Sequence, residues 1–265
     1  FSVTNGTATG CSIVAGTGAL TFTSAGTCMV TATKAADANY TSATTGAVTV
    51  TINKGTQAAL TVTSTTGTYP TSVSLTTSGG SGTGGVTYAL VSAGTAGCSV
   101  AGTTLSYANA GTCTVNATKA TDTNYNAIST ASTTVTINKA PQPPLNVTST
   151  TGTFPTSVSL TTSGGSGGGS VTYIASNGTA TGCSVSSGIL SFTSAGTCSV
   201  TATKVADANY NAISSAATTV TIAKGTQPTL VFSGQTVTYP TAFASLSTTG
   251  GSGGGAVTYA VTSAG

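Results

Sequence analysis

The sequence predicts an all-β chain of tandem immunoglobulin-like β-sandwich domains, about 85 residues per repeat, with one disulfide in each domain. Apolar and polar residues alternate with a period of two, and no helical period is present. Clusters of Gly, Ser, Asn and Pro separate the alternating runs, as turns require. The whole pattern then recurs along the chain, which indicates repeated domains of one kind.

The alternation within residues 55–139 indicates seven short strands that are separated by turn residues. These strands are expected near Leu60–Thr63, Ser72–Thr77, Val86–Val91, Cys98–Val100, Thr104–Tyr107, Thr112–Lys119 and Thr133–Asn138. Residue parity places Cys113, Val115 and Ala117 on one face of their strand and Val135 and Ile137 on one face of theirs. We expect these faces to form the core of a sandwich; a barrel is the alternative, but tandem units of this size favour the sandwich.

The repeat length follows from motifs that return at a fixed spacing. VTINK ends at Lys54 and again at Lys139, and VTIAK ends at Lys224, 85 residues apart each time. This phase gives two complete domains, 55–139 and 140–224, the C-terminal part of a domain in 1–54, and the N-terminal part of another in 225–265. We refer to 1–54, 55–139, 140–224 and 225–265 as the first, second, third and fourth segments.

Phe1 aligns with Tyr88 in the middle of a predicted strand, which suggests a stretch of a longer array. The alternative is a polymer in which residues 225–265 of one subunit complete residues 1–54 of the next by strand exchange.

The charge content argues against catalysis. Only 3% of the residues are charged, six of them Lys and three Asp, and the sequence has no Arg, Glu or His. General acid–base chemistry depends mostly on His and on carboxylates, so an enzyme is not expected, and neither is a cofactor. Six dispersed lysines make no basic stripe for nucleic acid, and no apolar run is long enough for a membrane helix.

Six cysteines fall in pairs, two to a repeat: Cys11 with Cys28, Cys98 with Cys113, and Cys183 with Cys198. Matched pairs favour disulfides and an extracellular or cell-surface location. Two lone cysteines per domain cannot fill a tetrahedral metal site, and no His is present to activate a nucleophilic thiol.

The charged residues recur at equivalent positions: Lys34, Asp37, Lys54, Lys119, Asp122, Lys139, Lys204, Asp207 and Lys224. We interpret them as a structural cluster in which one Asp anchors two Lys at one end of each sandwich while the Tyr that follows caps the core. An intramolecular isopeptide bond, or a metal or sugar site of Asp and Asn, is the functional alternative.

Five asparagines stand in N-x-[ST] sequons and are candidate glycosylation sites: Asn5, Asn39, Asn116, Asn146 and Asn177. The Gly-rich runs 79–85 and 164–169 have no following Lys or helix, so we interpret them as flexible connectors or turns between strands and not as phosphate loops. The short junctions, one of them rich in Pro, predict a stiff connection between domains.

The GTATGCS and SAGTC cysteine frame, the VTATKAADANY stretch and the closing VTINK resemble tandem bacterial immunoglobulin-like (Big-type) repeats of large secreted or surface proteins. The resemblance implies a structural or adhesive role. Our first hypothesis is a non-catalytic extracellular filament, sheath or stalk, with the chain itself as partner through end-to-end or lateral assembly, since few charges protect its strand edges. The second is an adhesin region that binds glycans or a surface through repeated loop Tyr and Asn residues.

Overall fold

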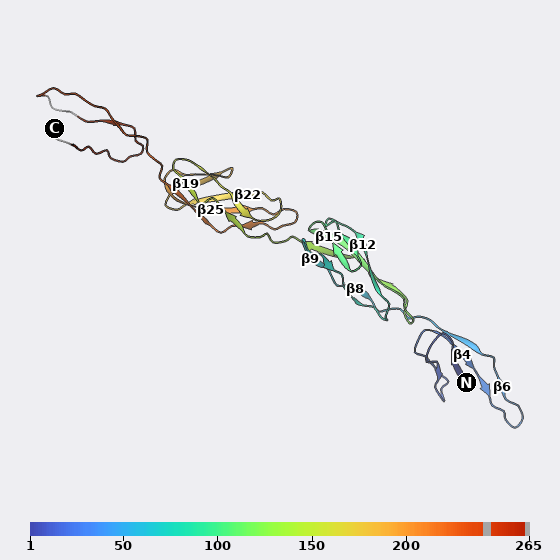
Figure 1. Cartoon of the computed structure of the whole chain (residues 1–265). Coiled ribbons are helices and arrows are strands. Elements are labelled where there is room, and N and C mark those ends of the chain that lie inside the picture. The colour runs from blue at the N-terminus through green and yellow to red at the C-terminus, as the bar shows by residue number, and fades with distance from the viewer. Residues whose placement is uncertain (241–244, 263–265) are drawn as a thin grey trace. The chain divides into compact units, whose positions relative to one another are not determined.

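The computed structural model describes residues 1–240 and 245–262. Contacts divide the chain into two compact units, Phe1–Gln142 with Ala206–Ala212, and Pro143–Val205 with Ile213–Gly265. Every regular element among the described residues is a β-strand (Figure 1). No helix in this part of the chain is long and apolar enough to cross a membrane.

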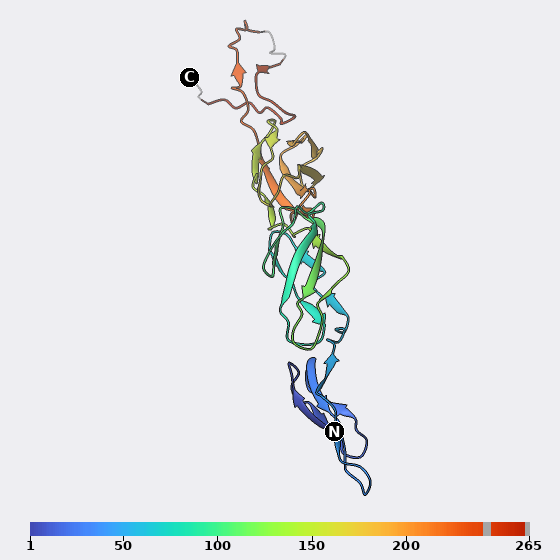
Figure 2. The ribbon, with the colours of Figure 1, turned by 90° about the vertical axis from the view of Figure 1, so that its right-hand side faces the viewer.

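The second segment is a sandwich of two layers. One layer is a sheet with the order β12-β15-β17-β9, to which β16 is added beside β15; the other holds the β10-β14-β13 sheet and the β11-β8 pair. Long strands β12 and β15 run side by side (Figure 1, Figure 2). The strands are β8 (Leu60–Val62), β9 (Thr66–Thr68), β10 (Val73–Ser74), β11 (Thr77–Gly79), β12 (Val86–Ser92), β13 (Ser99–Ala101), β14 (Thr104–Ser106), β15 (Gly111–Lys119), β16 (Ile128–Ser129) and β17 (Thr133–Asn138).

The third segment repeats this arrangement, with sheets β19-β27-β25-β22, β20-β24-β23 and β18-β21. Its strands are β18 (Leu145–Val147), β19 (Thr151–Thr153), β20 (Val158–Ser159), β21 (Thr162–Gly164), β22 (Val171–Asn177), β23 (Ser184–Ser186), β24 (Ile189–Ser191), β25 (Gly196–Lys204), β26 (Ile213–Ser214) and β27 (Thr218–Ala223). The second and third segments thus share one immunoglobulin-like sandwich arrangement.

The first and fourth segments hold complementary parts of this set. The first segment has the strands that match β12 to β17: β1 (Ser2–Asn5), β2 (Ser12–Ile13), β3 (Leu20–Thr21), β4 (Gly26–Thr31), β5 (Thr33–Lys34), β6 (Ala43–Thr44) and β7 (Val48–Ile52). The described part of the fourth segment has β28 (Val231–Phe232) paired with β29 (Thr248–Thr249), as β8 pairs with β11.

The core lies between the two layers and follows the predicted parity. Leu105, Val115 and Val135 are fully buried in the second segment, and Leu190, Val200 and Val220 are their counterparts in the third. The predicted inward residues Cys113, Ala117 and Ile137 belong to the same cluster. Thr and Ser occupy most outward positions of these strands, where β-branched or small polar side chains suit a pleated, solvated face.

The strand prediction was wrong in the early part of the repeat. Residues 72–77 do not form one strand, because β10 pairs with β14 in one sheet and β11 pairs with β8 in another. The chain changes partner at Leu75, which is buried and whose N–H donates to the carbonyl of Thr103. Strands β9 and β16 were not predicted, since such short runs carry no readable alternation; β9 is held by parallel pairing with β17.

Disulfides join the layers of each sandwich. The structure pairs Cys11 with Cys28, Cys98 with Cys113, and Cys183 with Cys198, with Cα–Cα distances of 6.0, 6.2 and 5.9 Å. In the second segment Cys98 precedes β13 in one layer and Cys113 lies in β15 of the other. No described cysteine is free.

Candidate functional site: the joint between repeats

The most strongly repeated polar feature is a loop with the sequence Asp-x-Asn-Tyr, residues 37–40, 122–125 and 207–210, which we name the DxNY loop. In the second segment Oδ1 of Asp122 accepts hydrogen bonds from the N–H groups of Asn124 at 2.9 Å and Tyr125 at 2.8 Å. The N–H of Asp122 donates to the carbonyl of Tyr125 at 3.1 Å. The first and third segments repeat these three bonds, so each loop is a closed turn organised by its carboxylate.

The second carboxylate oxygen fixes the loop to the Gly-rich run that connects β11 with β12. Oδ2 of Asp122 accepts a hydrogen bond from the N–H of Thr83. Gly82 lies so close that an added Cβ would collide with this carboxylate, and a Cβ on Gly84 would collide with the carbonyl of Ala120. Of the two interpretations of this run, a flexible connector or a turn between strands, the structure has the turn, and its glycines let the backbone pack directly against the loop.

Replacing Gly82 with Ala should therefore destabilise the loop. Gly82 has φ = 72°, which alone costs about 1–2 kcal/mol for an L-residue, and the collision with Asp122 adds to that cost. The matched control is Gly102→Ala, because Gly102 has φ = 59° and nothing within 4 Å of an added Cβ. Hydrogen exchange of the Thr83, Asn124 and Tyr125 amides measures the effect; equal exchange in the two variants would contradict it.

The same hydrogen bonds lower the pKa of Asp122 below its usual range. The backbone N–H of Thr83 contributes most, followed by that of Asn124, while desolvation acts in the opposite direction. The folded pKa of Asp122 therefore lies below its value in the unfolded chain, which is about 3.9. The stabilisation is fully present above that unfolded value and is lost as the pH falls through the folded pKa.

An acid titration followed by NMR should show the Thr83 amide shifting with a midpoint below about 3.9. The Asp122→Asn variant should show no such transition. A midpoint at or above the ordinary value of an aspartate would contradict the account.

The linker between repeats pairs with the DxNY loop of the repeat that follows. The N–H of Gly55 donates to the carbonyl of Asn124 at 2.8 Å, and the N–H of Asn126 donates to the carbonyl of Gly55 at 2.9 Å. Ala140, Asn209 and Asn211 make the same two bonds at the next joint, each at 2.9 Å. The linker is therefore held as a short parallel bridge to the tyrosine of the loop.

Two buried glutamines support the linker. Nε2 of Gln57 donates to the carbonyls of Ala120 at 3.2 Å and Asn126 at 2.7 Å, and Nε2 of Gln142 donates to the carbonyl of Asn211 at 2.6 Å. Sequence reasoning missed these residues, although Gln57, Gln142 and Gln227 recur at the 85-residue spacing just after each repeat boundary.

The asparagine of the loop reaches the preceding repeat. Oδ1 of Asn124 accepts a hydrogen bond from the N–H of Ala25 in the first segment at 2.9 Å. Oδ1 of Asn209 accepts the equivalent bond from Ala110 in the second segment, also at 2.9 Å, and its Nδ2 donates to Asn109 at 3.3 Å. These bonds join residues 99 to 100 positions apart, so one loop contacts two successive repeats.

The tyrosine of the loop contributes an apolar contact. The ring of Tyr210 meets Tyr69 edge to face, with centroids 5.6 Å apart and an interplanar angle of 84°. The ring of Tyr125 lies against the linker: its Cδ1 and Cε1 atoms are 3.6 Å from the point where a Cβ would stand if Gly55 were another residue. Tyr40 of the first loop is 77% exposed.

The structure corrects the predicted charge cluster. Lys54 donates from Nζ to Thr121 at 3.0 Å and to the main-chain carbonyl of Asp122 at 2.5 Å. Lys139 donates to the main-chain carbonyl of Asp207 at 2.5 Å. Each lysine thus binds the loop of the following repeat, not the Asp of its own, because the carboxylate is already engaged with backbone N–H groups.

The other lysines lie apart from this contact. Lys119 and Lys204 end β15 and β25 and are half-buried, whereas Lys34 and Lys224 are exposed. Lys54 donates to a hydroxyl and a main-chain carbonyl and Lys139 to a main-chain carbonyl, whereas an isopeptide bond would require a side-chain carbonyl. Among the described residues no group of three or more His, Cys, Asp or Glu is placed to hold a metal.

The five sequon asparagines occupy different environments. Asn5 and Asn177 accept hydrogen bonds at Oδ1 from the N–H groups of Cys11 and Cys183, at 2.9 and 2.8 Å. Asn116 is half-buried within β15, and Asn146 is exposed on β18. Asn39 is exposed in the first DxNY loop, at the position that Asn124 and Asn209 use for the joint.

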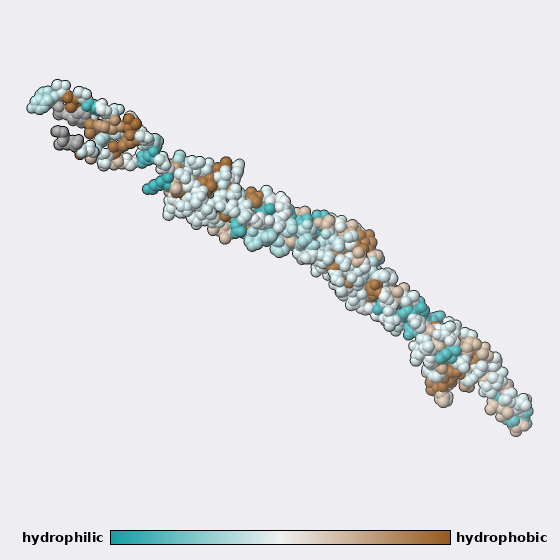
Figure 3. Space-filling model, in the orientation of Figure 1, coloured by the Kyte–Doolittle hydropathy of each residue, from teal (hydrophilic) through white to brown (hydrophobic). Residues whose placement is uncertain are grey.

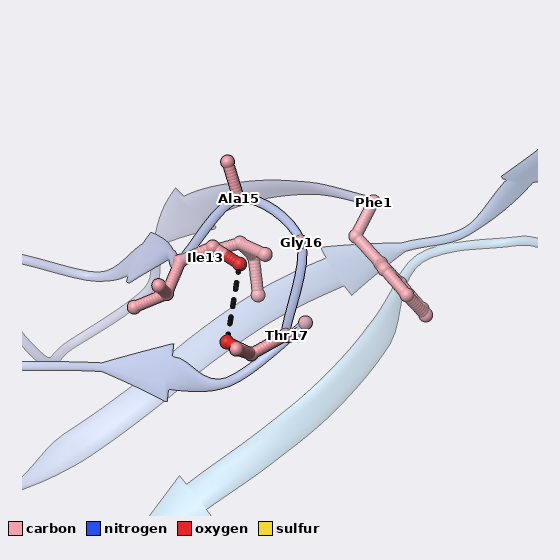
Figure 4. A pocket seen from close by; sticks show the side chains of 7 residues that line it. Phe1, Ile13, Ala15, Gly16 and Thr17 are labelled. Carbon is pink, nitrogen blue, oxygen red and sulfur yellow. Dashed lines mark hydrogen bonds between the residues drawn. The ribbon is translucent and has the colours of Figure 1, made fainter.

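A further hollow of the first segment lies beside Phe1. It is formed by Phe1 and the turn Ile13–Gly18, where Thr17 Oγ1 donates to the carbonyl of Val14 at 3.5 Å (Figure 4). Its lining has no charged side chain. Phe1 matches Tyr88 and Tyr173, which pack against the cores of their own repeats.

No family model matches this chain, and no curated protein matches it. Among solved structures, Drosophila N-cadherin EC1-4 is similar with 11% identity and a TM-score of 0.26, covering 78% of this chain and 60% of that one. Domains 1–6 of the surface layer protein SbsC are similar with 14% identity and a TM-score of 0.29, covering 84% of this chain and 35% of that one. The chain thus spans less than two thirds of either structure.

Proposed function

We propose that this protein is a non-catalytic structural component of an extracellular filament, sheath or surface stalk, built from repeats of the Big type. The paired cysteines support an oxidising, extracellular location. The low charge supports a structural role, because few groups titrate and few charges can be screened by salt.

The DxNY joint is the observation that carries the proposal. Two successive joints use the same main-chain bridge, the same asparagine contact to an alanine N–H, and the same lysine contact to the carbonyl of an aspartate. A covalent linker alone would leave neighbouring repeats free to swivel. These contacts hold the first segment to the second and would suit a repeat array that transmits force.

The joint also bears on the second candidate, adhesion through loop Tyr and Asn residues. Asn124 and Asn209 are engaged at joints, and Tyr125 and Tyr210 are half-buried there. Tyr40 is exposed, unlike the tyrosines of the other two loops. A repeated glycan site with several equivalent loops is therefore less well supported than a spacer.

Backbone NMR relaxation of the whole chain tests the structural role. Amides of β4 and β15 should report one common tumbling time in the wild type, and the Lys54→Ala/Asn124→Ala variant should separate them into two shorter ones. Asn146→Ala is the matched control, because Asn146 is exposed on β18. Independent tumbling of β4 and β15 in the wild type would overturn the proposal, and specific glycan binding abolished by Tyr40→Ala would favour adhesion.

A further inference from the structure

We infer that the sandwiches of the second and third segments resist tension along the chain, and that a parallel strand pair in each, β9 with β17 and β19 with β27, is the clamp that bears the load. The inference rests on the proposed structural function and adds what each repeat does within it. We name the pair β9–β17, with its equivalent β19–β27, the shear clamp.

The direction of the two strands sets how a load acts on them. Strand β9 lies near the start of the second segment and β17 at its end, and they pair in parallel through Thr66–Thr68 and Thr136–Asn138. Since both strands run the same way, the chain enters this sandwich at one end of the pair and leaves it at the other. Tension pulls β9 backward and β17 forward along their own axes, so the bonds between them lie across the load and must yield together.

Main-chain bonds mark both ends of this ladder. The N–H of Thr136 donates to the carbonyl of Thr65 at 2.9 Å, and the N–H of Tyr69 donates to the carbonyl of Asn138 at 3.0 Å. The third segment repeats both bonds at 2.8 and 2.9 Å, and its strands β19 and β27 are also parallel. The same clamp is therefore present in both sandwiches.

The shear clamp joins the incoming strand directly to the outgoing strand. Strand β8 lies upstream and pairs with β11 in the other layer, so its release would leave β9 in place and the sandwich closed. On its other side β17 is held by β15 through five residue pairs, against three for β9. The shorter ladder yields first, and its separation commits the repeat to unfold.

A glycine lets β9 lie directly against the core. A Cβ on Gly67 would stand 2.5 Å from Cγ2 of Val73, and Gly152 makes the equivalent close approach in the third segment. The hydroxyl of Tyr107, just after β14, donates to the carbonyl of Thr68 at 3.1 Å. The clamp is thus supported from the opposite layer as well as from β17.

The strands of the shear clamp carry no charged side chain. Their outward residues Thr66, Thr68, Thr136 and Asn138 are exposed and uncharged. Figure 3 shows the visible face of the second and third segments as mostly pale, as expected of a surface rich in Thr, Ser and Gly. Main-chain bonds and core packing therefore hold the load, so salt should leave the rupture force unchanged.

The disulfide limits how far an opened repeat can lengthen. Cys98 and Cys113 both lie between β9 and β17 along the chain, so they keep their 15-residue loop closed after the clamp separates. Removing this bond should lengthen the unfolding step of the second segment by about 45 Å, at roughly 3.3–3.6 Å per extended residue less the 6.2 Å that the closed pair spans. The longer step identifies the second segment in a pulling record.

Single-molecule pulling on the whole chain in two directions tests the shear clamp. Handles at the two ends of the chain load the second and third segments in shear. Moving the first handle to Ser72, an exposed residue just after β9, loads the second segment from the end where Thr68 pairs with Asn138 and opens the ladder one bond at a time. The second segment should then rupture at a clearly lower force than the third, which stays in shear and is the internal control.

The variant Gly67→Ala weakens the clamp from inside. The added Cβ collides with Val73, so the second segment should unfold about tenfold faster at a fixed end-to-end force, while the third is unchanged. The matched control is Gly85→Ala, because Gly85 is exposed and has nothing within 4 Å of an added Cβ.

Equal rupture forces in the two directions, or equal unfolding rates of Gly67→Ala and Gly85→Ala, would overturn the inference. Either result leaves the proposed function to its own test, because the common tumbling of β4 and β15 is measured without load. Separate tumbling together with a direction-dependent rupture force would instead contradict the proposed function and leave the shear clamp standing.

Discussion

Removing the Cys98–Cys113 disulfide with Cys98→Ser/Cys113→Ser should lower the free energy of unfolding of the second segment by about 3 kcal/mol. The two cysteines are 15 residues apart, and opening this loop increases the conformational entropy of the unfolded chain. Cys113 is also fully buried, so the serine hydroxyl takes the place of a disulfide sulfur in the core and adds to the loss. Urea unfolding followed by hydrogen-exchange mass spectrometry of β15 peptides measures the change.

The equivalent bond of the third segment, Cys183–Cys198, provides the control for this variant. Protection of β25 should remain at the wild-type level when only the Cys98–Cys113 bond is removed. Loss of protection in both segments together, or no loss in β15, would contradict an independent stabilising disulfide in each sandwich.

Leu105→Ala should destabilise the second segment by about 2–5 kcal/mol, because it removes a buried side chain and leaves a cavity between the layers. Leu105 lies on β14 and is 0% exposed. Its equivalent Leu20 lies on β3 and is only half-buried, so Leu20→Ala should cost clearly less.

Urea unfolding followed by hydrogen-exchange mass spectrometry measures the loss of unfolding free energy in each leucine variant, using peptides from the second segment for Leu105→Ala and from the first segment for Leu20→Ala. Equal losses would contradict the difference in burial between Leu20 and Leu105 on which the expected ranking rests.

The fold could be predicted from the sequence because the alternation of apolar and polar residues is a local pattern and recurs in each repeat. Alternation placed β12, β14, β15 and β17 and assigned Val115, Val135 and Ile137 to the core. The same reasoning failed at Leu75, where the chain crosses between sheets inside an unbroken alternating run. A change of pairing partner leaves no mark on the side-chain period.

The joint was only partly predictable. The recurrence of Asp122 and Lys54 marked them as structural, but the assignment of partners was wrong because it assumed contacts within one repeat. Contacts between Asn124 and Ala25 join residues 99 positions apart through main-chain atoms, and main-chain donors carry no sequence signal. The repeated Gln57 and the spacing of Gly82 and Gly84 were visible signals whose role needed the three-dimensional arrangement.

Native-state hydrogen exchange of the Ala25 and Ala110 amides tests the joint most directly. Both amides should be protected in the wild type, since each donates to a loop asparagine at 2.9 Å. Asn124→Ala should accelerate exchange at Ala25 alone and Asn209→Ala at Ala110 alone, so that each variant is the control for the other. Unprotected exchange of both amides in the wild type, or rates unchanged by either substitution, would contradict a DxNY loop that fastens one repeat to the next.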